Sequence, residues 1–261
     1  MIYEEKYDLL KQCVLEAGKI ILDADKEDLS IQDKDGICNV VTKYDVLVQD
    51  TLKKSLLEIL PNARFMGEEE EFNKDSFPDG YLFVVDPIDG TTNFSCNLPM
   101  IAISVALVYR GKPVIGFCYN PYTNEFYEAQ KGKGAYLNGK LIHVSNKILK
   151  DGLVLCGCAP YYQNLREKSL DIQRRLALVA GDYRRFGSAV LDICHVASGK
   201  AEFYFELKLM PWDFAAAGLI LEEAGGLLRD IYGKEVSYLE STSITASNGA
   251  ENYFSYFEDV I

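Results

Sequence analysis

Two acidic segments of the sequence carry the residue types best suited to chemistry. Residues 67–71 read GEEEE and residues 86–92 read DPIDGTT, and each follows an apolar stretch typical of a strand. A proline and a glycine in the second segment favour turns that bring Asp86 and Asp89 toward a common point and turn the Ile88 carbonyl outward. Oxygen atoms in such an array suit a hard divalent cation such as Mg²⁺. Without a cation, carboxylates this close would repel one another strongly.

The residues after Asp89 are suited to binding an anion. Gly90, Thr91 and Thr92 have the composition of a helix N-terminus, where unpaired backbone N–H groups and the helix dipole favour a phosphate oxygen. Metal ions beside a phosphate indicate hydrolysis of a phosphate ester. Two Mg²⁺ ions about 3.5–4 Å apart would hold the attacking water and the leaving oxygen on opposite sides of phosphorus, so no protein nucleophile is needed.

Each segment also has a simpler interpretation. A run of glutamates is usually a solvated surface, and an Asp-Pro…Asp-Gly stretch is usually a turn, so neither alone indicates an enzyme. The aspartyl-phosphate phosphatases are the nearest competing class, but one residue separates their two aspartates, whereas two separate Asp86 and Asp89. Residues 134–140 match the GxxxxGK pattern of a P-loop, but the next residue is Leu141, where a P-loop needs the hydroxyl of a Ser or Thr. The Asn-Gly pair in this segment favours a hairpin turn instead.

Composition narrows the function further. The 261 residues include 27 Lys and Arg against 39 Asp and Glu, a net charge of −12 that disfavours direct contact with nucleic acid or anionic lipid. With 48% apolar residues the chain can bury a substantial core. It shows no membrane-spanning stretch and no signal peptide, so we expect a cytoplasmic protein. Seven scattered cysteines without a CxxC pair disfavour disulfides and zinc, and neither His143 nor His195 has the context of a Ser-His-Asp triad.

Hydrophobic periodicity indicates the elements that must position the acidic segments. Helical spacing predicts amphipathic helices at 10–24 and 48–59, with a short extended piece at 39–42 between them. Residues 101–144 are typical of an antiparallel meander. The other expected elements are strands at 63–67, 81–86, 153–158, 201–206, 227–231 and 243–246, and helices at 161–180, 188–197, 212–225 and the C-terminal end.

A change in composition near residue 147 suggests two halves. Residues 1–146 would form an α+β half that holds the metal motifs, and residues 147–261 an α/β half that closes the site. No linker separates them, so we expect them to pack as one unit.

The sequence resembles the inositol monophosphatase family of Mg²⁺-dependent, lithium-sensitive phosphatases over nearly its whole length. Three motifs carry the resemblance, with weaker matches at NVVTKYD (39–45), GKGAYLNG (132–139) and GSAVLDICHVASGKAEFYFE (187–206). The three motifs are GEE at 67–69, DPIDGTTNF at 86–94 and WDFAAAGLILEEAGG at 212–226. The resemblance implies an α/β fold with alternating layers, an αβαβα sandwich, and a homodimer.

The resemblance also implies the ligands of two or three Mg²⁺ ions. Glu68, Asp86 and the Ile88 carbonyl would hold the first ion. Asp86 would bridge to a second ion held also by Asp89 and Asp213, and Glu68 would help to place a third through water. From the sequence alone, Asp213 at the start of a helix is more typical of a cap.

Catalytic roles map onto the matched positions in the same way. The attacking water would be activated near Glu68 and by the hydroxyl of Thr91, which in the family is paired with an acid at the position of Asp45. The amides of Gly90 and Thr91 would bind the phosphate. Asp45 otherwise resembles an ordinary acid in the first turn of a helix.

The sequence gives weaker support for the residues that would contact the rest of the substrate. Glu206 matches the acid that accepts a ring hydroxyl in inositol phosphatases, and Ser188 and Ala189 match a pair that lines the pocket. Lys34 and Glu69 are further candidates beside the metal and phosphate cluster. These positions favour a small polyol phosphate.

Several substrates stay open. We place myo-inositol 1-phosphate first, but relatives with the same metal motifs hydrolyse fructose 1,6-bisphosphate, histidinol phosphate, NADP(H) or 3′-phosphoadenosine 5′-phosphate. The differences would lie in loops such as 151–164, where Tyr161 and Tyr162 either stack on a base or pack. Because some bacterial relatives act as partners of the transcription machinery, a non-catalytic role is the second alternative.

Overall fold

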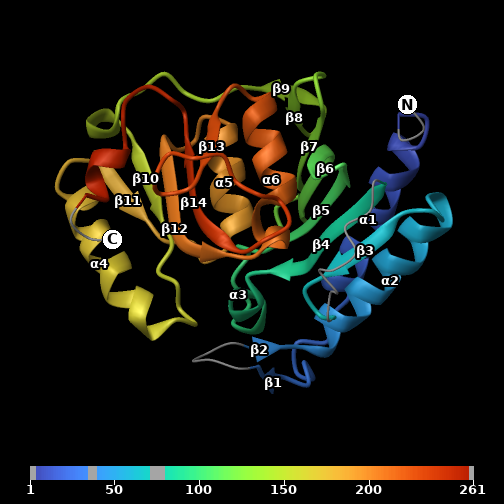
Figure 1. Cartoon of the computed structure of the whole chain (residues 1–261). Helices are drawn as coiled ribbons and strands as arrows, with labels where there is room; N and C mark the ends of the chain where they lie inside the picture. The colour runs from blue at the N-terminus through green and yellow to red at the C-terminus, as the bar shows by residue number, and fades with distance from the viewer. Residues whose placement is uncertain (1–3, 35–39, 71–79, 259–261) are drawn as a thin grey trace.

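The chain folds into five layers that alternate between helices and sheets (Figure 1). The computed structural model describes residues 4–34, 40–70 and 80–258. Helices α1 (Tyr7–Leu22) and α2 (Lys43–Ile59) cover the outer face of a seven-stranded sheet. A second helical pair fills the space between this sheet and a five-stranded sheet, whose far face is covered by one more helix. This is the αβαβα sandwich that the resemblance implies.

The seven-stranded sheet follows the chain order from β3 to β9. Only β3 and β4 run parallel, and the remaining neighbours are antiparallel, as expected for a meander. An Asn-Gly pair with positive φ at both residues closes the last hairpin. The strands are β3 (Arg64–Gly67), β4 (Tyr81–Asp89), β5 (Ala102–Tyr109), β6 (Lys112–Asn120), β7 (Glu125–Gln130), β8 (Ala135–Leu137) and β9 (Lys140–Ile142).

The five-stranded sheet is mixed, with the order β11-β10-β12-β14-β13. Strand β10 runs parallel to both of its neighbours, and β14 runs antiparallel to both of its own. Its strands are β10 (Leu153–Cys156), β11 (Asp182–Arg184), β12 (Phe203–Leu209), β13 (Leu227–Arg229) and β14 (Thr242–Ser247). The other elements are β1 (Gln32–Asp33), β2 (Val40–Val41), α3 (Thr91–Ser95), α4 (Gln163–Ala177), α5 (Ala189–Ala197), α6 (Pro211–Glu223), and the 3-10 helices η2 (Leu149–Asp151) and η3 (Phe254–Tyr256).

Helix α6 lies at the centre of the molecule, next to α5 and between the two sheets (Figure 1). It is apolar on nearly all sides, which is typical of a helix buried in a core. A Cβ on Gly116 of β6 would lie 2.6 Å from the Ala216 carbonyl oxygen, so only glycine lets the α6 backbone approach this closely. The backbone of α6 near Ala216 is thereby held close to the seven-stranded sheet.

Most of the predicted elements are confirmed, and one prediction fails. The prediction of a C-terminal helix is wrong for the described residues, which form only η3 there. The side chain of Asn252 accepts the backbone N–H of Phe254, and Tyr253 and Phe257 pack against Phe203 of the sheet. The sequence also did not predict β11, an exposed edge strand without an apolar run. Asn39 and Glu71, which belong to the predicted segments 39–42 and 67–71, lie outside the described residues.

None of the helices in the described ranges is long and apolar enough to cross a membrane.

Candidate metal and phosphate site

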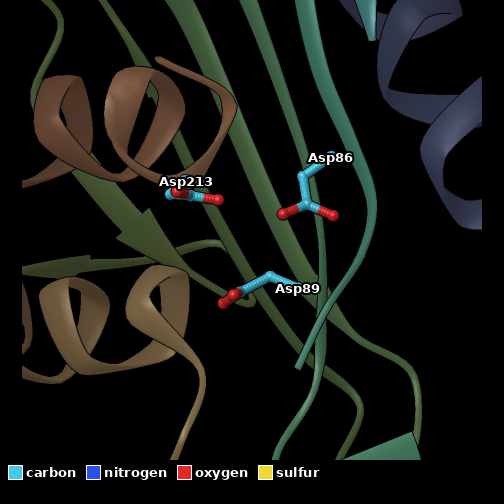
Figure 2. Close-up of side chains that lie close together, drawn as sticks. All are labelled: Asp86, Asp89 and Asp213. Atoms are coloured by element: carbon cyan, nitrogen blue, oxygen red, sulfur yellow. The ribbon is translucent and has the colours of Figure 1, made fainter. Parts of the chain in front are cut away.

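A bulge in β4 brings two aspartates to one face of the sheet. Asp86 pairs with Ser104 and Asp89 with Ala102, so β4 contains one residue more than β5 between these pairs. In a regular strand, residues three apart point to opposite faces. Here the extra residue restores a common direction, and the two carboxylates converge (Figure 2). The Ile88 side chain is completely buried on the other face, beneath α1 and α2.

The third carboxylate comes from the first turn of α6. Asp213 accepts the backbone N–H of Met210 at 2.7 Å, so it does cap the helix, as its sequence context suggested. Oxygen atoms of Asp86, Asp89 and Asp213 nevertheless lie within 4.8 Å of one another. One carboxyl group therefore both fixes the start of α6 and faces the strand aspartates (Figure 2).

Burial makes this carboxylate cluster electrostatically costly without a cation. It raises the pKa of Asp86 and Asp213 well above the ordinary value, and the neighbouring acids raise both further. Burial likewise raises the pKa of Asp89 to about 7, against hydrogen bonds from Ser188 and Val190. The donors are hard oxygen atoms, which Mg²⁺ prefers. The residues present therefore fit the divalent cation expected from the sequence.

We expect the metal-free protein to be more stable near pH 5 than at pH 8. Burial raises the pKa of Asp89 and of Glu206 to about 7 in the folded chain. A carboxyl group whose pKa is higher in the folded chain than in the unfolded chain contributes its full stabilisation at a pH below the unfolded pKa of about 4. This contribution is lost as the pH rises through the folded pKa of about 7. In EDTA, thermal melting should give a Tm lower by on the order of 5 °C at pH 8.

Excess Mg²⁺ should remove most of this difference, because it compensates the ionised carboxylates above pH 7. A metal-free Tm that rose steadily from pH 5 to pH 8 would contradict the expectation.

Glu68 lies at the edge of the cluster, where it contacts a lysine. Lys34 Nζ donates to Glu68 at 2.9 Å and to Glu69 at 2.5 Å. Burial alone would lower the pKa of Lys34, but the two glutamates outweigh it and raise that pKa. Glu68 borders the same cleft as the three aspartates, whereas Glu69 is half-buried behind it, with its pKa raised to about 7 by burial and then by Glu68.

The sequence did not single out Gln49, which fixes the start of this acidic segment. Its side-chain oxygen accepts the Glu69 backbone N–H at 2.9 Å. A Cβ on Gly67 would lie 2.2 Å from the same oxygen, so this contact requires glycine. The only signal available was a polar residue on the buried face of a helix, between Val48 and Leu52.

The predicted pairing of Thr91 with Asp45 is present in the structure. Thr91 Oγ1 lies 3.0 Å from Asp45 Oδ1 and 3.1 Å from the Ile88 carbonyl oxygen, and its single proton can bind only one of them at a time. The other oxygen of Asp45 accepts both the backbone N–H and the hydroxyl of Thr42. Burial raises the pKa of Asp45, and these hydrogen bonds oppose the rise. Asp45 is thus anchored at α2 and oriented toward Thr91.

The turn before α3 borders the cleft with Gly90 and Thr91. Gly90 has a φ of 92°, and a Cβ there would lie 2.9 Å from the Met100 carbonyl oxygen. Asn93 donates to the carbonyls of Met100 and Phe186, each at 2.8 Å. Because Phe186 precedes α5, this amide ties the predicted phosphate-binding turn to the second half of the chain.

The predicted substrate residues lie in different surroundings. Glu206 borders a cleft of about 600 Å³ and accepts the backbone N–H of Ala159. Ala189 borders the same cleft. Ser188 is only 1% exposed and donates its hydroxyl to Asp89, so the structure brings it to a carboxylate of the cluster. Its contact with substrate stays a prediction.

Comparison with known proteins gives the class of this chain. It belongs to the inositol monophosphatase family, whose sequence profile it matches over residues 3–261. Inositol monophosphatase 1 of Bos taurus is 34% identical over 251 residues, which cover 94% of this chain and 91% of that protein. The Nus factor SuhB of Vibrio cholerae is 37% identical over 82% of this chain and 78% of its own.

Solved structures agree with this assignment. An inositol monophosphatase of Thermotoga maritima superposes with a TM-score of 0.88 at 29% identity, over 98% of each chain. SuhB of Bartonella henselae gives a TM-score of 0.89 at 30% identity, over 98% of this chain and 99% of its own. Family membership supports phosphatase activity, and because the relatives include both inositol monophosphatases and SuhB proteins it does not select a substrate.

Proposed function

We propose that this protein is a Mg²⁺-dependent phosphomonoesterase that hydrolyses small polyol phosphates, with myo-inositol 1-phosphate as the first candidate. The observation that carries the proposal is the convergence of three aspartates, whose carboxylate oxygens lie within 4.8 Å of one another and which line a cleft of about 600 Å³. Three acids so close are tolerable at neutral pH when a divalent cation neutralises them. The family assignment supports the same chemistry.

The metal ligands that we propose come from both halves of the chain. Asp86, Asp89 and Asp213 would hold Mg²⁺ together with Glu68 and the Ile88 carbonyl, as two or three ions. The bound ions would lower the pKa of the attacking water and neutralise charge on the phosphate. Lys34, which donates to both Glu68 and Glu69, would hold the Glu68 side chain in position.

The remaining roles belong to groups of the chain itself. The amides of Gly90 and Thr91 would bind phosphate oxygens. The Thr91 hydroxyl, while donating to Asp45, leaves its lone pairs free to accept a hydrogen from the attacking water and so to orient that water. Glu206 would accept a hydroxyl of the polyol.

Further roles fall to the start of α5 and the residue before it. Ala189 would pack against the polyol. Ser188 would contact substrate beside Asp89, to which its hydroxyl donates. We also keep the homodimer, the cytoplasmic location and the two halves 1–146 and 147–261 as proposals.

A phosphate-release screen tests this proposal. Purified protein with Mg²⁺ should release phosphate from myo-inositol 1-phosphate, and the panel should include fructose 1,6-bisphosphate, histidinol phosphate, NADP(H) and 3′-phosphoadenosine 5′-phosphate. Chelation with EDTA should abolish release, and Mg²⁺ should restore it. Full activity after chelation would overturn the mechanism, and no release from any ester would favour a non-catalytic role such as the name Nus factor suggests for the SuhB relatives.

A further inference from the structure

Lys26 lies in the loop that joins α1 to β1, and its charge rests on an aromatic ring. The Nζ atom lies 3.3 Å from the centroid of the Phe94 ring and 5.3 Å from that of the Tyr122 ring. It is buried, and it has no hydrogen-bond partner among the described residues. An ammonium group over the face of an aromatic ring is attracted by the ring electrons, most strongly where water is excluded. The Phe94 ring is therefore the nearest partner of this charge.

Carboxylates do not compensate the charge of Lys26. A solvated lysine has a pKa of about 10.4, and burial alone lowers the pKa of Lys26 to about 8. Asp28 pairs with Lys43, and Asp25 accepts the backbone N–H of Glu27. The titratable groups around Lys26 are those of Asp23, Asp25, Glu27 and Asp28 in its own loop, Lys43 and Tyr44 in α2, and Tyr122 after β6.

The ring under Lys26 belongs to the same short helix as Thr91. Phe94 and Thr91 lie three residues apart in α3, so their side chains project from one face of that helix. On this face the Thr91 hydroxyl contacts Asp45, and the Phe94 ring meets the ring of Tyr44 edge to face at 5.9 Å. A contact that holds the Phe94 ring therefore also holds the helix that carries the Thr91 hydroxyl.

Helix α3 depends on such contacts. It has five residues, and its N-cap is Gly90, which has no side chain to cap it. A helix this short is not stable through its own hydrogen bonds and relies on tertiary packing. The loop of Lys26 is anchored in turn, because the Asp25 backbone N–H donates to the hydroxyl of Tyr44 at 2.8 Å. Lys26 thus connects an anchored loop to α3.

We propose that Lys26 is a positioning residue for the reaction, which holds α3 through the Phe94 ring and thereby orients the Thr91 hydroxyl against Asp45. This inference rests on the phosphatase activity proposed above and adds a residue that touches neither substrate nor metal. Small misplacements of a group that orients the attacking water raise the barrier of the chemical step. The loss of Lys26 should therefore appear in kcat more than in KM.

The kinetic test compares three substitutions on the substrate that the screen identifies. Lys26→Met removes the charge and keeps an unbranched side chain, so kcat should fall about fivefold while KM changes less than about twofold. Lys26→Arg should restore at least about half of the wild-type kcat, because a guanidinium also stacks on aromatic rings. Lys19→Met removes an exposed, ion-paired charge from α1 and is the matched control, which should change neither constant.

Two kinetic outcomes would contradict the inference. One is a kcat of Lys26→Met within about twofold of the wild-type value, or a loss confined to KM. The other is an arginine variant as slow as the methionine variant, which would show that a charge over the ring is not what matters.

The pH dependence separates the charge of Lys26 from its bulk. Below pH 7 the wild-type amine is protonated, so kcat of wild type and of Lys26→Met should differ fully. The difference should shrink as the pH rises through about 8, because the wild-type amine then loses its charge as well. Both proteins carry the same carboxylates, so the ratio of their kcat values cancels the titration of the metal site. A ratio that stayed constant from about pH 6.5 to about pH 9.5 would refute the role of the charge.

Hydrogen exchange gives a readout that needs neither metal nor substrate. In EDTA, the backbone amides of α3 should exchange at least about threefold faster in Lys26→Met than in wild type, whereas those of β5 should not change. Unchanged exchange in α3 would overturn the inference and leave the phosphatase intact. Absence of phosphate release by the wild-type protein would instead overturn the proposed function, while exchange would still report whether Lys26 holds α3.

Discussion

Replacing Asp86 by asparagine should lower Mg²⁺-dependent phosphate release by at least about a thousandfold. Asp86 is 1% exposed, and its carboxylate lies within 4.8 Å of those of Asp89 and Asp213, so it belongs to the part of the cluster that a cation must neutralise. An amide keeps the shape of the side chain but removes its charge. Turnover of the substrate that the screen identifies, followed at increasing Mg²⁺, measures the effect.

The same substitution should stabilise the metal-free protein at pH 8, because it removes one of several buried like charges. The opposite signs of these two effects separate a metal ligand from a structural residue, whose loss would lower both activity and stability. Asp50→Asn, on the exposed face of α2, is the control and should change neither. Retention of more than a tenth of the activity in Asp86→Asn would contradict the proposed metal site.

Thr91→Val should lower kcat about a hundredfold and change KM little. Valine has nearly the shape of threonine but cannot donate to Asp45 or accept a hydrogen from water, so the attacking water would lose its orientation. The amide of residue 91 remains, and phosphate binding should therefore persist. Steady-state kinetics at saturating Mg²⁺ measure the two constants separately.

A double-mutant cycle tests whether Thr91 and Asp45 act together. Asp45→Asn should cause a similar loss, and the double variant should lose little more than either single variant, because each breaks the same contact of 3.0 Å. Thermal melting of Asp45→Asn checks that the start of α2 survives. Losses that multiply in the double variant would show that the two residues act independently.

The sequence predicted the parts of the site that depend on local geometry. Asp86 and Asp89 stand three positions apart with turn residues between them, and that spacing alone indicated a shared oxygen array. Asp213 required the resemblance, because its place beside them depends on how α6 packs against the seven-stranded sheet. The pairing of Asp45 with Thr91 likewise joins segments that only the fold brings together.

Other residues of the site could not be predicted from the sequence, because their contacts also join segments that only the fold brings together. Nothing local indicates that the Ser188 hydroxyl reaches Asp89, or that Gln49 holds the Glu69 backbone. Arg185 and Lys208 are ordinary surface types, and they border one cleft only after β12 and the residues before α5 are placed. Propensity and periodicity describe elements, whereas these contacts depend on tertiary packing.

The extra residue in β4 limits which changes of length this chain can accept. The side chains of Leu82 and Val84 point to the middle layer, and without the bulge Asp89 would follow Phe83 and Val85 into the outer layer beneath α1 and α2. Deleting Ile88 would complete the ladder with β5 and leave Asp89 on the same face as Asp86, but it would remove a completely buried side chain of the outer layer and the carbonyl next to Thr91. Insertions and deletions among descendants of this gene should therefore collect at hairpin tips, and the spacing between the two strand aspartates should stay constant.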